Sequence, residues 1–304
     1  MQVVRIILLS LLLQAHAAMA DDFADHAGAA YTIKPNIVYA TASNVPLTLD
    51  VYLPAAGKRP VLVYFHGGGW VEGRKENAAL LLMPYLALGW AVVNVEYRLA
   101  KVASAPAAVE DVRCALRWVH ERAGEYKFDL DAVVVAGDSA GGHLALMAAM
   151  LPPGNEYDRR CPTGDAYRWG GAAEPPMKVA AVVNWFGVTD VAAMLSGPGA
   201  RHFAIEWFGA DAGREALARR LSPINNIRQG IPPVITVHGN ADPVVPYAQA
   251  QSLHAALDGA KVINKLISIE GGRHGGFAKA DMIGANRQIR AFLGAVGLPV
   301  DAVR

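Results

Sequence analysis

Short apolar runs alternate with longer amphipathic stretches along most of the chain. Several runs, such as "VLVYF" and "AVVVAG", are apolar at every position, which is typical of strands buried on both faces of a sheet. Stretches with helical spacing of their apolar residues follow most of the runs, and glycine, proline and asparagine mark the turns. The pattern predicts strands at residues 36–40, 47–54, 61–65, 90–99, 132–138, 178–190, 234–238 and 261–271, and helices at 77–88, 106–124, after 139, at 247–258 and at 280–295.

This alternation indicates one α/β domain over residues 21–304, with a mostly parallel sheet covered by helices on both faces. The first two strands are predicted to form an antiparallel hairpin. Two segments interrupt the alternation of strands and helices. Residues 152–178 are rich in proline, glycine and charged residues, and residues 191–230 are irregular and contain several aromatic residues. We expect the first to be a surface excursion and the second a small lid-like insertion.

One serine stands where a predicted strand meets a predicted helix, in "GDSAGGH". Gly137, Ser139 and Gly141 form a G-x-S-x-G pattern, which in this context builds a strained turn that exposes the serine hydroxyl. The small neighbours are needed because a side chain two residues away would collide with the backbone. The competing interpretation is an ordinary helix N-cap, for which serine is also favoured. Ligands of such sheets bind at the carboxyl ends of the strands, where this turn lies.

A nucleophilic serine needs a base, and four histidines follow the predicted helix after Ser139. His274 is the favoured base because its loop, "EGGRHGGF", leaves the carboxyl end of the last predicted strand. The other three are placed less suitably: His202 in the irregular insertion, His238 at the end of a strand, and His254 within a helix.

The base needs an acid that orients it. Asp242, in "HGNADPVVP", follows the penultimate strand and precedes His274, which is the chain order expected for this fold. Its alternative role is that of a turn residue before Pro243. Asp190, after the preceding strand, is the rival acid. Asp138 stands beside the serine and is expected to stabilise the turn or a neighbouring loop.

The segment "HGGGW", residues 66–70, follows a buried strand and is expected to bind a developing oxyanion. Glycines let backbone amides approach a substrate closely, so the predicted donors are the amides of Gly68, Gly69 and Ala140. A phosphate-binding loop is the alternative, but the spacing lacks the lysine and the serine or threonine of such loops. His66 is expected to hold this loop in place.

Together, "HGGGW", "VEYRL", "GDSAGGH", "HGNADPVVP" and "RHGGF" resemble the α/β-hydrolase superfamily over residues 35–296. Within it the chain is similar to carboxylesterases related to hormone-sensitive lipase and to bacterial feruloyl and acetylxylan esterases. The resemblance implies an α/β-hydrolase fold and hydrolysis of short-acyl or aromatic-acyl esters, including esters on plant polysaccharide, with no metal or cofactor. The tryptophan after the glycines also resembles arylformamidases, which gives the main alternative. A serine peptidase and a non-catalytic binding module with this fold are further alternatives.

Aromatic side chains are expected to line a substrate pocket. The alternative is that they pack in the core or in the insertion. The residues proposed for the pocket are Trp70, Trp185, Phe186 and Trp207.

The charge of the chain limits the kinds of partner it can bind, and the N-terminal segment indicates in which compartment it works. The formal net charge is +1 and no basic run is present, which argues against nucleic acid as a partner.

Residues 1–20 are predicted to be a signal peptide, with one early arginine, an apolar stretch and the A-x-A pattern of Ala18 and Ala20. The alternative is a membrane anchor, but the apolar run is shorter than the roughly 20 residues that span a bilayer. We therefore expect a secreted or periplasmic protein without a membrane segment after cleavage.

The chain has two cysteines, Cys114 and Cys161. Two are too few for a structural zinc site, and in an exported protein an even pair favours a disulfide. Helical spacing places Cys114 off the apolar stripe of its predicted helix, on a side where it can face the segment that carries Cys161. Two unrelated thiols are the alternative. The apolar stripe consists of Val109, Val112, Leu116 and Val119.

Overall fold

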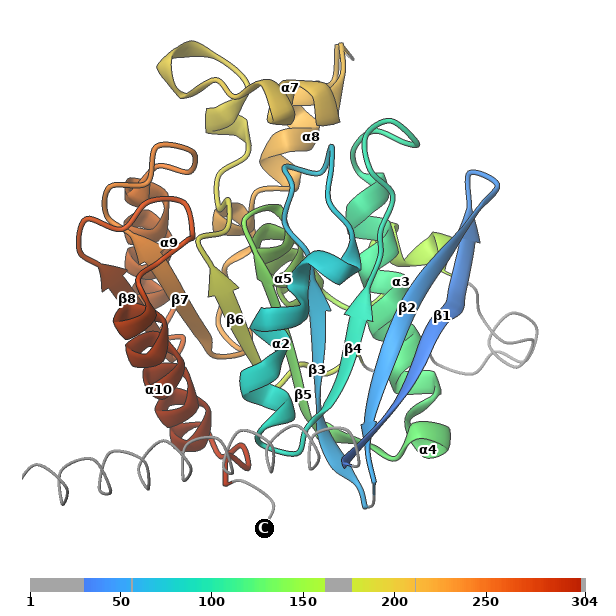
Figure 1. The fold of residues 1–304 in the computed structure, drawn as a ribbon. Coiled ribbons are helices and arrows are strands. Elements are labelled where there is room, and N and C mark those ends of the chain that lie inside the picture. Colours follow the sequence, from blue (N-terminus) through green and yellow to red (C-terminus); the bar gives the residue numbers. More distant parts are fainter. Residues whose placement is uncertain (1–29, 56, 162–176, 211, 302–304) are drawn as a thin grey trace, which may run out of the picture.

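A computed structural model describes residues 30–55, 57–161, 177–210 and 212–301 of the chain. Within these residues one sheet has the strand order β1-β2-β4-β3-β5-β6-β7-β8 (Figure 1). β2 pairs antiparallel with β1 and β4, and the remaining neighbours are parallel. The predicted signal peptide, residues 1–20, lies outside the described residues. The strands are β1 (Tyr31–Ala42), β2 (Val45–Pro54), β3 (Arg59–Phe65), β4 (Ala91–Val95), β5 (Phe128–Asp138), β6 (Ala181–Trp185), β7 (Val234–Gly239) and β8 (Asn264–Ile269).

Helices cover both faces of the sheet, as predicted (Figure 1). Successive side chains of a strand point to opposite faces, so Val61, Val63 and Phe65 of β3 enter one core while Leu62 and Tyr64 enter the other. No helix of the described residues combines the length and apolar character needed to cross a membrane. The first core is completed by α3 (Ala107–Glu121), α5 (Ala140–Met150) and α9 (Tyr247–Gly259), and the second by the 3-10 turn η1 (Lys75–Ala78), α2 (Ala79–Leu86) and α10 (Lys279–Ala295); the short α4 (Ala123–Tyr126) follows α3.

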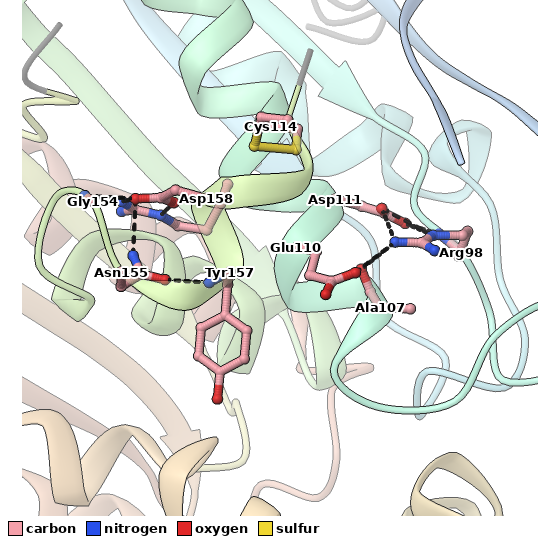
Figure 2. The surroundings of a disulfide bond; sticks show 11 residues. Arg98, Ala107, Glu110, Asp111, Cys114, Gly154, Asn155, Tyr157 and Asp158 are labelled. Carbon is pink, nitrogen blue, oxygen red and sulfur yellow. Dashed lines mark hydrogen bonds and ion pairs between the residues drawn. A yellow bond between two sulfur atoms is a disulfide. The ribbon is translucent and has the colours of Figure 1, made fainter. Parts of the chain in front are cut away.

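Three strands are shorter than the sequence predicts, and the one expected over residues 261–271 runs only from Asn264 to Ile269. The strand expected over residues 90–99 ends at Val95, because Arg98 is buried and its guanidinium binds Asp111 of α3 (Figure 2). The strand expected over residues 178–190 ends at Trp185, since the next residue, Phe186, has a φ of +39° that no strand continues. Single hydrophobic residues such as Leu99 and Val188 lie beyond these two ends, so hydrophobic residues alone do not locate the ends.

The two segments that interrupt the alternation of strands and helices hold short helices. Residues 191–230 were expected to be irregular, but they contain two helices that lie above the carboxyl edge of the sheet (Figure 1). Of residues 152–178, the part from 162 to 176 lies outside the described residues. The elements are η2 (Glu156–Arg160) in the first segment, and η3 (Ala192–Met194), η4 (Gly197–Gly199), α7 (His202–Phe208), α8 (Arg214–Arg220) and η5 (Pro223–Asn226) in the second.

The predicted bridge between Cys114 and Cys161 is formed, and joins α3 to the end of η2 (Figure 2). A buried ion pair lies beside it: Arg113 Nε donates to Asp158 Oδ1 at 2.6 Å, and a terminal nitrogen of Arg113 donates to Oδ2 at 2.7 Å. Both side chains are almost completely shielded from solvent. The first surface excursion is therefore attached to the core at two adjacent points.

Removing one partner of this pair is expected to destabilise the protein strongly. Arg113→Met leaves the Asp158 carboxylate buried without its cation, which costs about 3–5 kcal/mol in the free energy of unfolding measured by urea titration. The matched control is Arg122→Met, whose exposed pair with Glu125 is expected to contribute less than about 1 kcal/mol. Equal, small losses in the two variants would show that the buried pair does not anchor the excursion.

Candidate active site

Ser139 lies on a strained turn between β5 and α5. Its φ of +53° and ψ of −118° are sparsely populated by residues other than glycine. A Cβ at Gly137 would lie 2.3 Å from the carbonyl oxygen of Gly141, and a Cβ at Gly141 would lie 2.0 Å from that of Phe65. The Ser139 amide also donates to the carbonyl of Trp185 at 2.8 Å. The fold therefore requires glycine at both positions and holds the serine in one conformation, which a simple N-cap does not need.

His274 and Asp242 meet Ser139 from two loops at the same edge of the sheet. His274 follows β8, and its Nε2 lies 2.8 Å from the hydroxyl oxygen of Ser139. Its Nδ1 lies 2.7 Å from Asp242 Oδ2, on the loop after β7. A neutral imidazole that donates from Nδ1 to the carboxylate leaves Nε2 free to accept the serine proton. The three residues thus form a continuous hydrogen-bonded line in the predicted order.

The carboxylate of Asp242 has more donors than the sequence suggests. Its Oδ1 accepts the amides of Val244 at 2.8 Å and Val245 at 3.0 Å, and its Oδ2 lies 3.1 Å from Nε2 of His238. Burial alone would raise the pKa of Asp242, but the hydrogen bonds from His238 and His274 bring it below its ordinary value. Asp242 is therefore held as the anion that an orienting acid must be.

His238 is the residue at this site that the sequence reasoning missed. The sequence does not favour His238 as the base, because it lies at the end of a strand and precedes the acid on the same loop. Yet a fully buried histidine at the end of the apolar strand "VITVH" needs a polar partner, and Asp242 follows four residues later. The polar residue at the end of an apolar strand was the sequence feature that could have identified His238.

The glycine-rich loop after β3 faces the serine. Gly68 and Gly69 have φ values of +116° and +59°, and a Cβ at Gly68 would lie 2.1 Å from the carbonyl oxygen of Glu72. A Cβ at Gly69 would lie 2.9 Å from Cβ of Phe203 in α7. Ala140 opens α5, where a backbone amide has no acceptor within its own helix. These three positions surround the serine turn and suit backbone donation to a substrate oxygen.

Asp138 and His66 both stabilise this loop. Asp138 Oδ1 accepts the hydroxyl of Tyr64 at 2.9 Å and the amide of Gly67 at 3.1 Å, and burial raises the pKa of this carboxyl. Nδ1 of His66 donates to the carbonyl of Gly67 at 2.7 Å, and its ring stacks on Tyr97 at 4.3 Å between centroids. Neither side chain is bonded to His274, so neither orients the base.

A cavity of about 530 Å³ opens at Ser139. Of the four aromatic residues predicted to line it, Trp185 and Phe186 do so. The Phe186 ring also packs edge-on against His274, with 4.8 Å between centroids. Apart from Ser139 and His274, the lining comprises Gly68, Gly69, Val71, Glu72, Leu81, Asp138, Trp185, Phe186, His202, Phe203, Val244, Gly275, Gly276, Phe277 and Met282.

The pocket prediction is wrong for Trp70 and Trp207. Both side chains are fully buried and stack on each other at 4.3 Å between centroids. The His143 ring packs edge-on against both, and its Nε2 lies 2.7 Å from the carbonyl oxygen of Leu221. The cluster joins the glycine-rich loop, α5 and α7, so these tryptophans hold elements of the site together without lining the cavity.

The rival residues lie elsewhere. Asp190 accepts the amide of Ala193 at 3.1 Å and is not bonded to His274. Nδ1 of His254 lies 2.6 Å from the side-chain oxygen of Asn264. His202 lines the cavity at the start of α7. No group of three or more His, Cys, Asp or Glu side chains in the described parts of the chain is arranged to hold a metal ion.

The sheet order and the serine turn define the class: this is an α/β-hydrolase fold, as the sequence predicted. The chain belongs to the BD-FAE family, whose model matches residues 49–257. A second model, described as TAP-like protein, matches residues 216–303.

The chain is similar in sequence to esterases and carboxylic ester hydrolases. Esterase LipQ of Mycobacterium tuberculosis (strain ATCC 25618 / H37Rv) is 31% identical over 210 residues, which are 67% of this chain and 47% of LipQ. The probable carboxylic ester hydrolase LipM of the same strain is 31% identical over 218 residues, 70% of this chain and 48% of LipM. The chain thus spans about half the length of these relatives.

This chain matches two solved structures over nearly the whole length of those structures. The propionate-bound esterase 2 of Thermogutta terrifontis has a TM-score of 0.71 and 28% identity, covering 89% of this chain and 96% of that one. A truncated carbohydrate esterase from gut microbiota has a TM-score of 0.70 and 27% identity, covering 86% and 97%. The fold described here therefore matches these two esterase structures over most of both chains.

Proposed function

We propose that the protein is a serine carboxylesterase in which Ser139 is the nucleophile, His274 the general base and Asp242 the orienting acid. The observation that carries the proposal is the hydrogen-bonded line from Asp242 through His274 to Ser139, which ends at a cavity. The esterases among the similar proteins support it.

Acylation follows from this geometry. Nε2 of His274 takes the hydroxyl proton of Ser139 while the serine oxygen attacks the ester carbonyl carbon. Asp242 stabilises the imidazolium that forms, because its carboxylate stays ionised and accepts a hydrogen bond from Nδ1–H of His274. The carbonyl oxygen becomes an oxyanion, which the amides of Gly68, Gly69 and Ala140 bind.

Collapse of the tetrahedral intermediate breaks the bond to the alcohol, and His274 gives its proton to the departing oxygen. Water then enters, loses a proton to the same nitrogen and attacks the acyl-enzyme carbonyl. The second collapse releases the carboxylic acid, and the proton returns to Ser139. Each half-reaction uses the same base and the same oxyanion donors.

Short-acyl and aromatic-acyl esters are the substrates we propose, including acetyl and feruloyl esters on plant polysaccharide. A cavity of about 530 Å³ lined by Trp185, Phe186, Phe203 and Phe277 suits an aromatic acyl group. A propionate-bound esterase and a carbohydrate esterase among the similar structures agree with a small acyl group and a sugar alcohol.

We also propose export to the periplasm or the medium. The A-x-A pattern at Ala18 and Ala20 fits a signal peptidase site. The bridge between Cys114 and Cys161 fits an oxidising compartment.

A substrate panel tests the proposed activity. Purified protein is assayed with p-nitrophenyl acetate, p-nitrophenyl butyrate, methyl ferulate, acetylated xylan and N-formylkynurenine, and kcat/KM is compared. We expect the esters to be hydrolysed with higher kcat/KM than the formamide. Faster hydrolysis of N-formylkynurenine would indicate an arylformamidase, and no hydrolysis of any ester would overturn the proposal.

A further inference from the structure

His238 is a second histidine on the acid of the proposed triad. It is the penultimate residue of β7 and is fully buried. Its Nε2 lies 3.1 Å from Oδ2 of Asp242 and 3.0 Å from the carbonyl oxygen of Val245. Because Oδ2 also receives Nδ1 of His274, one carboxylate oxygen lies between two imidazoles.

The partners of His238 determine which of its nitrogens carries the proton. A carboxylate and a carbonyl oxygen only accept, so Nε2 must be protonated and is shared between them. Nδ1 is buried and has no hydrogen-bond partner in the structure as described. A proton there would be a buried, unsatisfied donor, which costs free energy, so the favoured form is the neutral Nε2–H tautomer.

This arrangement affects the base through the acid. β7 is paired on both sides, by β6 and β8, so a donor on this strand fixes the side chain of a residue on the following loop to a rigid element. A hydrogen bond to Oδ2 also takes up part of the carboxylate's negative charge. The less charge Oδ2 offers to Nδ1 of His274, the less strongly the imidazole holds a second proton.

We propose that His238 is a positioning residue, whose Nε2–H holds Oδ2 of Asp242 against His274 and moderates how strongly His274 binds a proton. The proposal rests on the proposed function, since it assigns His238 a role in that triad. It adds a fourth side chain that does not contact the substrate.

Other ionisable groups surround the triad and stay unchanged in the test variants. Arg201 donates to the carbonyls of Val244 and Pro243 on the acid loop. The Tyr247 ring packs edge-on against His238, and its hydroxyl bonds Ser268. Glu72, Asp138 and His202 line the cavity, and Arg273 precedes His274.

The test compares the pH dependence of kcat/KM for p-nitrophenyl acetate in His238→Leu and His238→Gln. In His238→Leu we expect the acid limb of the profile to move to higher pH, because Oδ2 of Asp242 then offers more negative charge to Nδ1 of His274. We also expect kcat to fall about tenfold or more, because the hydrogen bond to a charged group is lost. In His238→Gln the amide nitrogen can occupy the place of Nε2, and both changes should largely reverse. His254→Gln alters another buried histidine, away from Asp242, and is expected to keep the wild-type profile.

Two results would overturn the inference. One is an unchanged acid limb in His238→Leu with only a lower melting temperature, which is the behaviour of a purely structural residue. The other comes from nitrogen-15 NMR of the wild-type protein, which reports where each imidazole carries its proton. We expect His238 to be the neutral Nε2–H tautomer in the active pH range. A charged or Nδ1–H form of His238 would contradict the proposal. Absence of esterase activity in the wild type would instead be a failure of the proposed function.

Discussion

Replacing the proposed nucleophile, Ser139→Ala, is expected to lower kcat for p-nitrophenyl acetate by about 10⁴- to 10⁶-fold while the protein stays folded. The reason is that no other hydroxyl occupies the strained turn that His274 addresses at 2.8 Å. The binding cavity and the oxyanion donors remain, so we expect residual activity about 10³- to 10⁴-fold above the uncatalysed rate.

The control for this variant is Ser196→Ala, which changes an exposed serine far along the chain from the turn. It should keep wild-type kcat and KM. Urea titration should give similar free energies of unfolding for both variants. If Ser139→Ala kept more than about a tenth of wild-type activity, the hydroxyl would not be the nucleophile.

The second large effect is expected from Asp242→Asn, with a loss of roughly 10⁴-fold in kcat/KM. An asparagine amide can present a donor to His274, and the imidazole then turns its Nδ1 lone pair toward it and carries its proton on Nε2. That tautomer cannot accept the proton of Ser139. The developing imidazolium also loses the anion 2.7 Å away.

The matched control is Asp190→Asn, the other acid that follows a strand at the same edge of the sheet. Asp190 contacts the amide of Ala193 and not the base, so we expect less than a threefold change in activity, of the size of a surface substitution within about 0.5 kcal/mol. A larger loss in Asp190→Asn than in Asp242→Asn would reverse the assignment of the acid.

The sequence predicted the parts of the site that depend on local geometry. Gly137 and Gly141 could be predicted to be part of the turn because only glycine fits there. Any Cβ at these positions would collide with the backbone. The loops that carry Asp242 and His274 follow two strands, and parallel strands end at one edge of a sheet. Strand order along the chain therefore implied that the two loops are neighbours.

The missed features depend on which side chains pair across distant segments. Trp70 and Trp207 lie far apart in the sequence, and no periodic pattern links them, so the sequence does not indicate that their rings stack. His238 was overlooked because its partner is a loop carboxylate that turns back onto the strand end. Side-chain contacts of this kind follow from the loop conformation, which residue type alone does not determine.

Covalent labelling tests most directly whether Ser139 is the nucleophile. An organophosphate such as paraoxon reacts covalently with an activated serine. We predict one phosphoryl group per chain on the peptide that contains Ser139, formed in step with the loss of esterase activity and absent from Ser139→Ala. Complete inactivation with the label on another residue, or equal labelling of Ser139→Ala, would contradict the assignment.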